Sequence, residues 1–360
     1  MEKETLYIAG PMCFYIDGYP RWYLMRDRAK IKGFNVSMPS DAQLDMDPVD
    51  LQKNAVTIFK NCAKSINEAT AIICNLEFYR GADVDGGSIY ELGMAYAKNA
   101  ACYAYTRDKR PYFWKYQGYS IKDGNVYDRK GRILPFGNLP FSPNVVGACK
   151  IVEGDFDDCL KVFEMDVEEK RKHAAFPAVP VEHKKTALPN EGMPVVYLAG
   201  PERYDADAEE KYRAMKALCI EAGLYAVVPT DAVPGIPAPD TGDSYTDAYL
   251  TFLRQQQHVR DCDIIIANLN DFHGWEPDSD TSFECGMAFQ LGKKMFSYMD
   301  STQKMIDRVP NFGKDFDYRD HCGCNAENFD YPINLMFSGS MPVLEGNFET
   351  VLSKVVELLK

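Results

Sequence analysis

The sequence predicts two doubly wound α/β domains with parallel sheets, related by an internal duplication. Residues 6–42 align without a gap on residues 196–232, at an offset of 190. The match resumes from Asn75 and Asn268 at an offset of 193. Within each copy, short apolar runs alternate with longer helix-like stretches, which is the pattern of a βαβ chain. A repeat of this length is too long for a solenoid unit and has the size of a domain.

The strands are predicted from short apolar runs. Runs such as AIICN and DIIIAN are typical of strands that are buried on both faces of a parallel sheet. A doubly wound domain of the flavodoxin or Rossmann-like type follows from this alternation. The predicted strands are residues 5–9, 35–38, 71–75 and 102–105 in the first copy, and 195–199, 225–228, 263–268 and 295–298 in the second.

Helices are predicted between these strands. The first helix of each copy ends near Gly33 or Gly223, because glycine is favoured just after a helix. The later helices are expected at about residues 51–67, from 88 and after 156 in the first copy, and at about 247–261, from 281 and after 348 in the second.

The domain boundaries are predicted from composition. The first domain is expected at residues 1–164 and the second at 193–360. Residues 165–192 are rich in Lys, Glu and Pro, which indicates a linker, although this stretch can begin as the tail of a helix. Irregular excursions occupy residues 107–143 and 300–333, and we expect them to line a ligand pocket.

Composition and charge exclude several classes of protein. The net charge is −13, and the basic patch that a nucleic-acid-binding surface needs is not evident. No apolar run approaches 18 residues, so no membrane-spanning helix is expected. The N-terminus lacks the apolar core of a signal peptide. The eleven cysteines sit mostly singly and the histidines form no ligand motif, which favours buried free thiols, a cytoplasmic protein and no metal.

The most informative polar residues are two acidic pairs. Asp85 and Glu91 match Asp278 and Glu284, each pair after a buried strand and at the start of a helix. Ligands of such sheets bind beyond the carboxyl ends of the strands. Two carboxylates there can divide labour, one as nucleophile or base and the other at the leaving group. The alternative is that they solvate a loop and favour a helix N-terminus, but recurrence in both copies favours chemistry.

Four separated motifs appear in order around these acids. They are Y-[IL]-A-G-P, N-L-x3-[RH]-G, D-x-G-S-x-x-E-x-G-M-A and F-x-Y-P-I-N-L-M. With them the chain resembles the nucleoside 2-deoxyribosyltransferase family, in two tandem copies. The resemblance implies transfer of 2-deoxyribose between nucleobases in nucleoside salvage, through a covalent glutamyl intermediate with retention at C1′. It implies deoxynucleosides and free nucleobases as partners and no cofactor.

The resemblance also implies a role for each matched residue. The glutamates match the nucleophile, the aspartates match the acid near the base, and tyrosines in the first strands match the residue that orients the nucleophile. The implied catalytic residues are Glu91, Asp85, Tyr7, Glu284, Asp278 and Tyr197. The implied substrate-binding residues are Gly10, Asp17, Gly87, Asn334 and Met336, together with Gly200, Asp207 and Asn144.

Members of this family complete each site with an Asn-x-Met from a neighbouring subunit. Asn334-Leu335-Met336 matches fully, whereas the first copy has Val146 in place of methionine. The resemblance therefore predicts an intramolecular pseudo-dimer whose halves exchange these segments, and it leaves further homo-oligomers open. Asp280 replaces Gly87 in the second copy. We expect backbone strain at Asp280, because glycine readily takes a positive φ and aspartate does so at a cost. We also expect the added carboxylate to raise the pKa values of Asp278 and Glu284.

Two other functions remain open. A hydrolase would use the same glutamate and let water resolve the intermediate, and its substrate would be a nucleoside or a nucleotide. The turn after the first strand is poor in glycine, whereas phosphate is usually held by backbone amides of a glycine-rich turn, so an uncharged nucleoside is favoured. A non-catalytic nucleoside-binding protein is the second alternative, although both glutamates are present.

Overall fold

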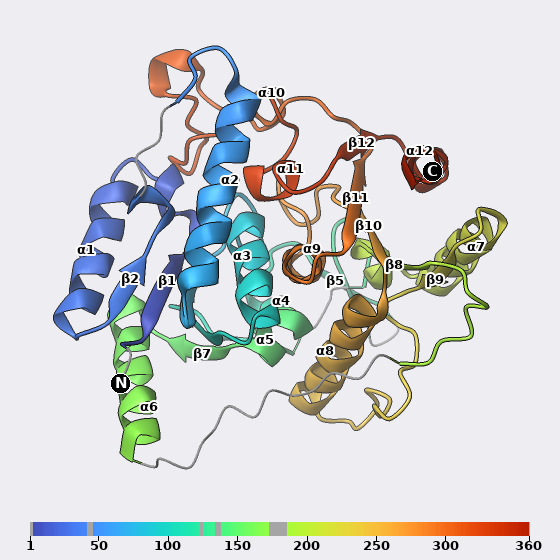
Figure 1. The fold of residues 1–360 in the computed structure, drawn as a ribbon, viewed down its shortest axis with the longest axis horizontal. Helices are drawn as coiled ribbons and strands as arrows, with labels where there is room; N and C mark the ends of the chain where they lie inside the picture. The colour runs from blue at the N-terminus through green and yellow to red at the C-terminus, as the bar shows by residue number, and fades with distance from the viewer. Residues whose placement is uncertain (1–2, 42–45, 123–124, 134–137, 173–185, 360) are drawn as a thin grey trace.

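The computed structural model describes residues 3–41, 46–122, 125–133, 138–172 and 186–359. It contains two five-stranded parallel sheets, one in each half of the chain (Figure 1). The strand orders are β2-β1-β3-β4-β7 and β12-β11-β10-β8-β9, so each sheet winds outward in both directions from its first strand. The predicted fold class, two duplicated α/β domains, is confirmed.

The predicted strands are present, with ends that shift by at most one residue. The first sheet consists of β1 (Thr5–Ala9), β2 (Asn35–Ser37), β3 (Ala71–Asn75), β4 (Ala101–Thr106) and β7 (Lys150–Glu153). The second consists of β8 (Val195–Ala199), β9 (Tyr225–Val227), β10 (Ile264–Asn268), β11 (Lys294–Met299) and β12 (Val343–Glu345). The sequence interpretation did not include β7 and β12, because these edge strands are short and only partly apolar.

The helices cover both faces of each sheet (Figure 1). The long ones are α1 (Gly18–Ile31), α2 (Leu51–Glu68), α3 (Gly86–Ala97), α6 (Phe156–Lys172), α7 (Ala208–Glu221), α8 (Ser244–Asp261), α9 (Ser279–Gln290) and α12 (Phe348–Leu359). The outer helices α1, α6, α7 and α12 pack on two separate apolar clusters. The inner helices α2, α3, α8 and α9 share one cluster that runs through both halves.

The expected linker begins inside a helix. Helix α6 continues to Lys172, beyond the predicted boundary at residue 164. Residues 173–185 of the expected linker lie outside the described residues. The boundary at 193 falls in the segment that leads into β8, and the division into domains stays a prediction.

The two halves meet where α3 packs against α9 (Figure 1). Their backbones touch at glycines that occupy matched positions. A Cβ atom on Gly93 would lie 2.1 Å from the carbonyl oxygen of Phe283, and one on Gly286 would lie 1.9 Å from that of Tyr90. Glycine is therefore needed at both positions, and this contact places the acidic helix of each half beside the other half.

The two excursions are built from short elements and loops. They also cross to the opposite half, because residues 317–329 lie beside the first acidic loop and Ile133 bonds to Tyr204 of the second half. The short elements of the chain are η1 (Pro11–Phe14), η2 (Pro39–Asp41), α4 (Tyr112–Lys115), β5 (Ser120–Lys122), β6 (Asn125–Tyr127), α5 (Pro143–Ala148), η3 (Pro201–Tyr204), α10 (Met305–Arg308), η4 (Lys314–Phe316) and α11 (Leu335–Ser338).

Candidate active site

The two predicted aspartates begin the two inner helices. Asp85 is the N-cap of α3, and its Oδ2 accepts a hydrogen bond from the Ser88 backbone N–H at 2.9 Å. Asp278 caps α9 in the same way, through the Thr281 N–H at 3.0 Å. Such caps satisfy backbone donors that the helix leaves free. Each aspartate thus has a structural function in addition to any chemical one.

Glu91 lies on the buried side of α3, and its neighbour is Tyr7 of β1. The Tyr7 hydroxyl donates a hydrogen bond to Glu91 Oε1. Burial raises the pKa of Glu91 to about 8, and the bond from Tyr7 opposes this rise. The structure therefore brings together the predicted nucleophile and the predicted orienting tyrosine.

A cavity of about 580 Å³ opens beside Glu91, and both halves of the chain line it. The first half contributes Tyr7, Gly10, Asp85, Gly87 and Glu91, with Cys13, Phe14, Trp22 and Ser88 among others. The second half contributes Asn334, Leu335 and Met336, with Asp317, Tyr318, Asn325, Glu327 and Phe329. The predicted placement of the Asn-x-Met segment is thus seen in the geometry of the first site.

Gly87 is needed for a reason that differs from the one predicted. It lies in α3, and its φ is not positive. A Cβ atom there would lie 2.7 Å from the Asn334 side chain, so glycine makes room for the segment donated by the second half. The matched Asp280 is also helical without positive φ, and our expectation of backbone strain at Asp280 is wrong.

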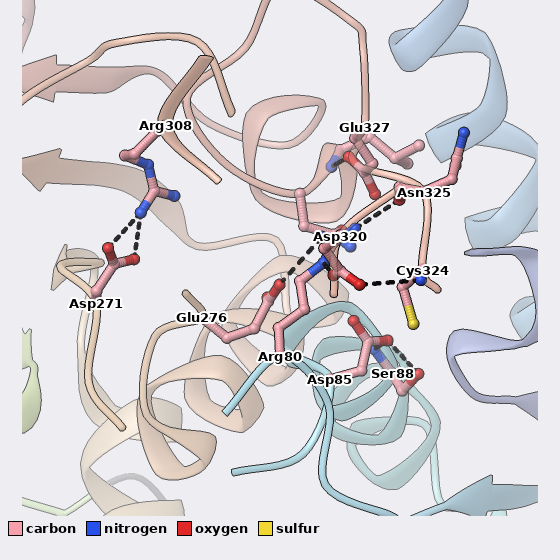
Figure 2. A network of polar contacts seen from close by, with 12 residues as sticks. Arg80, Asp85, Ser88, Asp271, Glu276, Arg308, Asp320, Cys324, Asn325 and Glu327 are labelled. Carbon is pink, nitrogen blue, oxygen red and sulfur yellow. Dashed lines mark hydrogen bonds and ion pairs between the residues drawn. The ribbon is translucent and has the colours of Figure 1, made fainter. Parts of the chain in front are cut away.

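Arg80 joins the second excursion to the first acidic loop (Figure 2). Its guanidinium donates to Asp320 Oδ2 at 3.1 Å and to the Asn325 carbonyl at 2.5 Å, and it lies 3.9 Å from Glu276. The Arg80 side chain is 1% exposed. The matched residue of the second half, His273, bonds Asp128 of the first excursion at 3.0 Å. Each half therefore holds the excursion of the other through an equivalent pair.

Glu327 is a cavity residue that the sequence interpretation missed. Its Oε2 accepts a hydrogen bond from the Leu335 N–H at 2.9 Å, in the middle of the donated Asn-x-Met. Burial raises its pKa to about 8. It lies in an irregular stretch, so periodicity gave no signal for it.

The second acidic site is occupied by an arginine. The guanidinium of Arg203 forms a two-pronged ion pair with Glu284, at 2.8 and 2.7 Å. The Tyr197 hydroxyl donates to the same carboxylate at 2.7 Å. The side chains of Arg203 and Glu284 are 4% and 1% exposed. Burial raises the pKa of Glu284 and Arg203 opposes that rise, so Glu284 is an ion-paired carboxylate sealed from solvent.

Protein side chains also fill the space around Glu284. Asp280 accepts hydrogen bonds from the Asn144 N–H at 3.0 Å and from the Tyr204 hydroxyl at 2.7 Å. The Asn144 amide lies 3.5 Å from Glu284, so the first half does lend its asparagine. The expected rise in pKa from the added carboxylate is present at Glu284 but is smaller than the opposing effect of Arg203.

Three predicted substrate-binding residues lie elsewhere. Asp17 and Asp207 are N-cap residues of α1 and α7, and they pair with Arg21 and Lys211 at the surface, at 2.7 and 3.0 Å. Asp17 does not line the cavity beside Glu91. Gly200 packs against the Glu202 carboxylate, which bonds Asn268. Position after the first strand was a good guide for Gly10, which lines the cavity, but not for Asp17 and Asp207, whose side chains turn toward their own helices.

Within the described residues, no group of three His, Cys, Asp or Glu side chains is arranged to hold a metal ion. No helix in the described ranges is long and apolar enough to cross a membrane.

The fold and the site define a two-copy α/β protein with a buried tyrosine–glutamate pair beside a cavity. The sequence profile named nucleoside 2-deoxyribosyltransferase matches residues 6–171 and 196–336. The chain therefore belongs to the nucleoside 2-deoxyribosyltransferase family, whose members act on nucleosides and nucleobases. A search of curated proteins found no match.

Three solved structures similar to this chain each cover about one half of it. A 2-deoxyribosyltransferase from Leishmania mexicana is 28% identical, with 46% of this chain and 97% of that chain covered and a TM-score of 0.36. One from Bacillus psychrosaccharolyticus is 16% identical, with coverages of 44% and 90% and a TM-score of 0.29. A CMP N-glycosidase from Clostridium botulinum is 15% identical, with coverages of 45% and 97% and a TM-score of 0.25.

Proposed function

We propose that this chain transfers 2-deoxyribose between nucleobases and that Glu91 forms the covalent intermediate. The observation that carries the proposal is the buried Glu91 carboxyl, held by Tyr7 beside a cavity that both halves line. In the first step an oxygen of ionised Glu91 bonds to C1′, and the C1′–N bond breaks with its electrons going to the base. In the second step a new base attacks C1′ and releases Glu91. Two inversions give net retention.

Each neighbour of Glu91 has a proposed role in these steps. Tyr7 fixes the orientation of the carboxylate. Asp85 carries the proton that the departing base takes up and the incoming base returns, and burial supports this role by raising its pKa. Asn334 and Met336 close the site from the second half and hold the sugar. A carboxylate with a raised pKa is also a stronger nucleophile once it has lost its proton.

We further propose that Glu91 is the nucleophile that works and that Glu284 serves the structure. Glu284 has the equivalent position, with Asp278 and Tyr197 as its predicted partners. However, Arg203 binds both of its oxygens. An attack on C1′ would require this ion pair to break and the buried guanidinium to leave. Removing a buried charge from its partner is costly, so the second site is the weaker candidate.

An uncharged substrate is supported by the charges around the cavity. Four carboxyl groups line it, those of Asp85, Glu91, Asp317 and Glu327. Among the described residues that line it there is no Lys, Arg or His. A phosphate would meet the charges of Asp317 and of Glu91 in the ionised form that attacks C1′, without a cation to compensate. This favours a nucleoside over a nucleotide, and it disfavours a nucleotide hydrolase.

Discrimination against phosphate gives a direct prediction. We expect the kcat/KM of deoxyinosine or thymidine to exceed that of its 5′-monophosphate by at least about fivefold, because a like-charge contact costs on the order of 1 kcal/mol or more. Base release or exchange is followed by chromatography for the matched pair. Equal or higher kcat/KM for the monophosphate would contradict the assignment of a nucleoside substrate.

The function itself is tested by offering a deoxynucleoside with and without a second base. Thymidine or deoxyinosine is incubated with adenine, and the products are separated by chromatography. We expect deoxyadenosine to form, with little free deoxyribose. Free deoxyribose as the main product would identify a hydrolase. Tight binding of the nucleoside without either product would identify a binding protein.

A further inference from the structure

Glu327 has one oxygen that is bound and one that is not. Oε2 accepts the hydrogen bond from the Leu335 N–H at 2.9 Å. Oε1 is buried and has no hydrogen-bond partner among the described residues. The side chain forms part of the wall of the cavity beside Glu91. A buried polar atom without a partner is uncommon and calls for a ligand or a proton.

The bond to Leu335 decides where a proton on Glu327 would sit. Oε2 already faces a backbone N–H donor, so a proton on this carboxyl group must lie on Oε1. Burial raises the pKa of Glu327 to about 8, so this proton is largely retained at pH 7. Oε1 is then the oxygen that can donate a hydrogen bond, on a side chain that lines the cavity and belongs to the second half of the chain.

Asp85 has the same arrangement on the first half (Figure 2). Its Oδ2 accepts from the N–H and the hydroxyl of Ser88. Its Oδ1 is buried without a partner within the described part of the chain. When Asp85 is protonated, the proton therefore lies on Oδ1. The cavity wall thus combines two acid groups, one from each half, whose unbound oxygens are the ones that can donate.

We propose that Glu327 donates a hydrogen bond to a carbonyl oxygen of the nucleobase and makes the site prefer oxo-bases over amino-bases. The inference rests on the proposed function and names the substrate class of the same site. Guanine and thymine present a carbonyl oxygen where adenine and cytosine present an amino group. Hypoxanthine and uracil share that carbonyl. An amino group is itself a donor, so it would leave the Glu327 proton without an acceptor.

The wild-type enzyme provides the first test, with acceptor bases that differ at this substituent. We expect kcat/KM to be about tenfold or more higher for hypoxanthine than for adenine, and for uracil than for cytosine, since an unmade buried hydrogen bond costs roughly 1–3 kcal/mol. Equal values, or a preference for the amino-base in either pair, would overturn the inference. Failure of every base to exchange would instead remove the proposed function.

Two substitutions of Glu327 distinguish a role in base preference from a role in holding the Leu335 backbone. In Glu327→Gln the amide oxygen can accept from Leu335, which leaves the NH₂ group as a donor toward the base, so the oxo preference should persist. Glu327→Met removes both groups, and the ratio between hypoxanthine and adenine should fall about tenfold. If Glu327 had a purely structural role, Glu327→Met would lower kcat/KM equally for hypoxanthine and adenine. That result would refute the proposal.

A matched control lies in the same acidic network. Glu276 is a buried carboxyl beside Arg80 (Figure 2), but it does not line the cavity. Glu276→Gln should leave the ratio between the two bases unchanged, and a loss of preference in this variant would count against a direct contact from Glu327. Thermal melting monitors folding. If Glu327→Met does not fold, the proposal is decided by Glu327→Gln and by the wild-type comparisons of hypoxanthine with adenine and of uracil with cytosine.

Discussion

Replacing Glu91 with glutamine is expected to lower kcat for base exchange by about 10³- to 10⁶-fold, the range seen when a covalent nucleophile is removed. Glutamine keeps the size of the side chain and can still accept from Tyr7, which holds Glu91 in the native chain. The change therefore isolates the lost nucleophilic charge. Glu284→Gln should leave kcat within about tenfold of the wild type, on the same scale of effects. Chromatographic rates per mole of folded protein provide the comparison.

The second substitution needs a correction for stability. Glu284→Gln leaves Arg203 with only the more distant Asp280, 3.9 Å away, as a counter-charge, so activity must be referred to the folded fraction. Covalent trapping with a 2-fluoro-arabinosyl nucleoside, followed by peptide mass spectrometry, identifies the attacked residue. We expect one label per chain, on Glu91. A label on Glu284, with Glu91→Gln still active, would show that the second half carries the chemistry.

Arg203→Ala is expected to destabilise the chain by about 3–5 kcal/mol, because it leaves a buried carboxylate unpaired. Glu284 and Arg203 are almost fully enclosed and bonded through two contacts. The double variant Arg203→Met with Glu284→Leu removes both charges of this pair and should recover part of this loss, since Asp280 then also lacks Arg203. Urea unfolding monitored by circular dichroism measures all three proteins.

The control is an exposed ion pair of the same half. Arg213 and Glu209 lie 3.4 Å apart, with side chains 73% and 94% exposed. Arg213→Ala should cost less than about 1 kcal/mol, because exposed pairs contribute little. Equal losses for Arg203→Ala and Arg213→Ala would mean that the second site is solvated and can open. Our assignment of Glu284 to a structural role would then fall.

The sheets and inner helices could be predicted because burial leaves a strong pattern. AIICN and DIIIAN are apolar on both faces, and they became β3 and β10 almost without a shift. The edge strands β7 and β12 carry no such pattern, since each has partly exposed residues at both ends. Edge pairing depends on neighbours that are distant in sequence, which a single sequence does not reveal.

The catalytic aspartates and glutamates could be predicted because they recur in both copies of the sequence. The side chains that surround them could not be predicted in this way. Arg203 stands at the position of Cys13 and was visible in the sequence. Its effect depends on a side chain that reaches Glu284, 81 residues away along the chain. The need for Gly87 likewise comes from Asn334, which only the packed structure places beside it. Contacts between distant segments decide these functions, and local patterns do not encode them.

The crossing of the two excursions has a consequence for how this chain can vary. In a dimer of identical subunits, any substitution in the loop that covers a site changes both sites at once. Here residues 107–143 and 300–333 are encoded separately, and each covers the opposite half. The first excursion bonds Tyr204 of the second half through Ile133, next to the closed site. The second excursion keeps Glu327 beside Glu91, so the two loops can change independently. Fusion of the copies thus frees one half to become a scaffold without any change in the chemistry of the other.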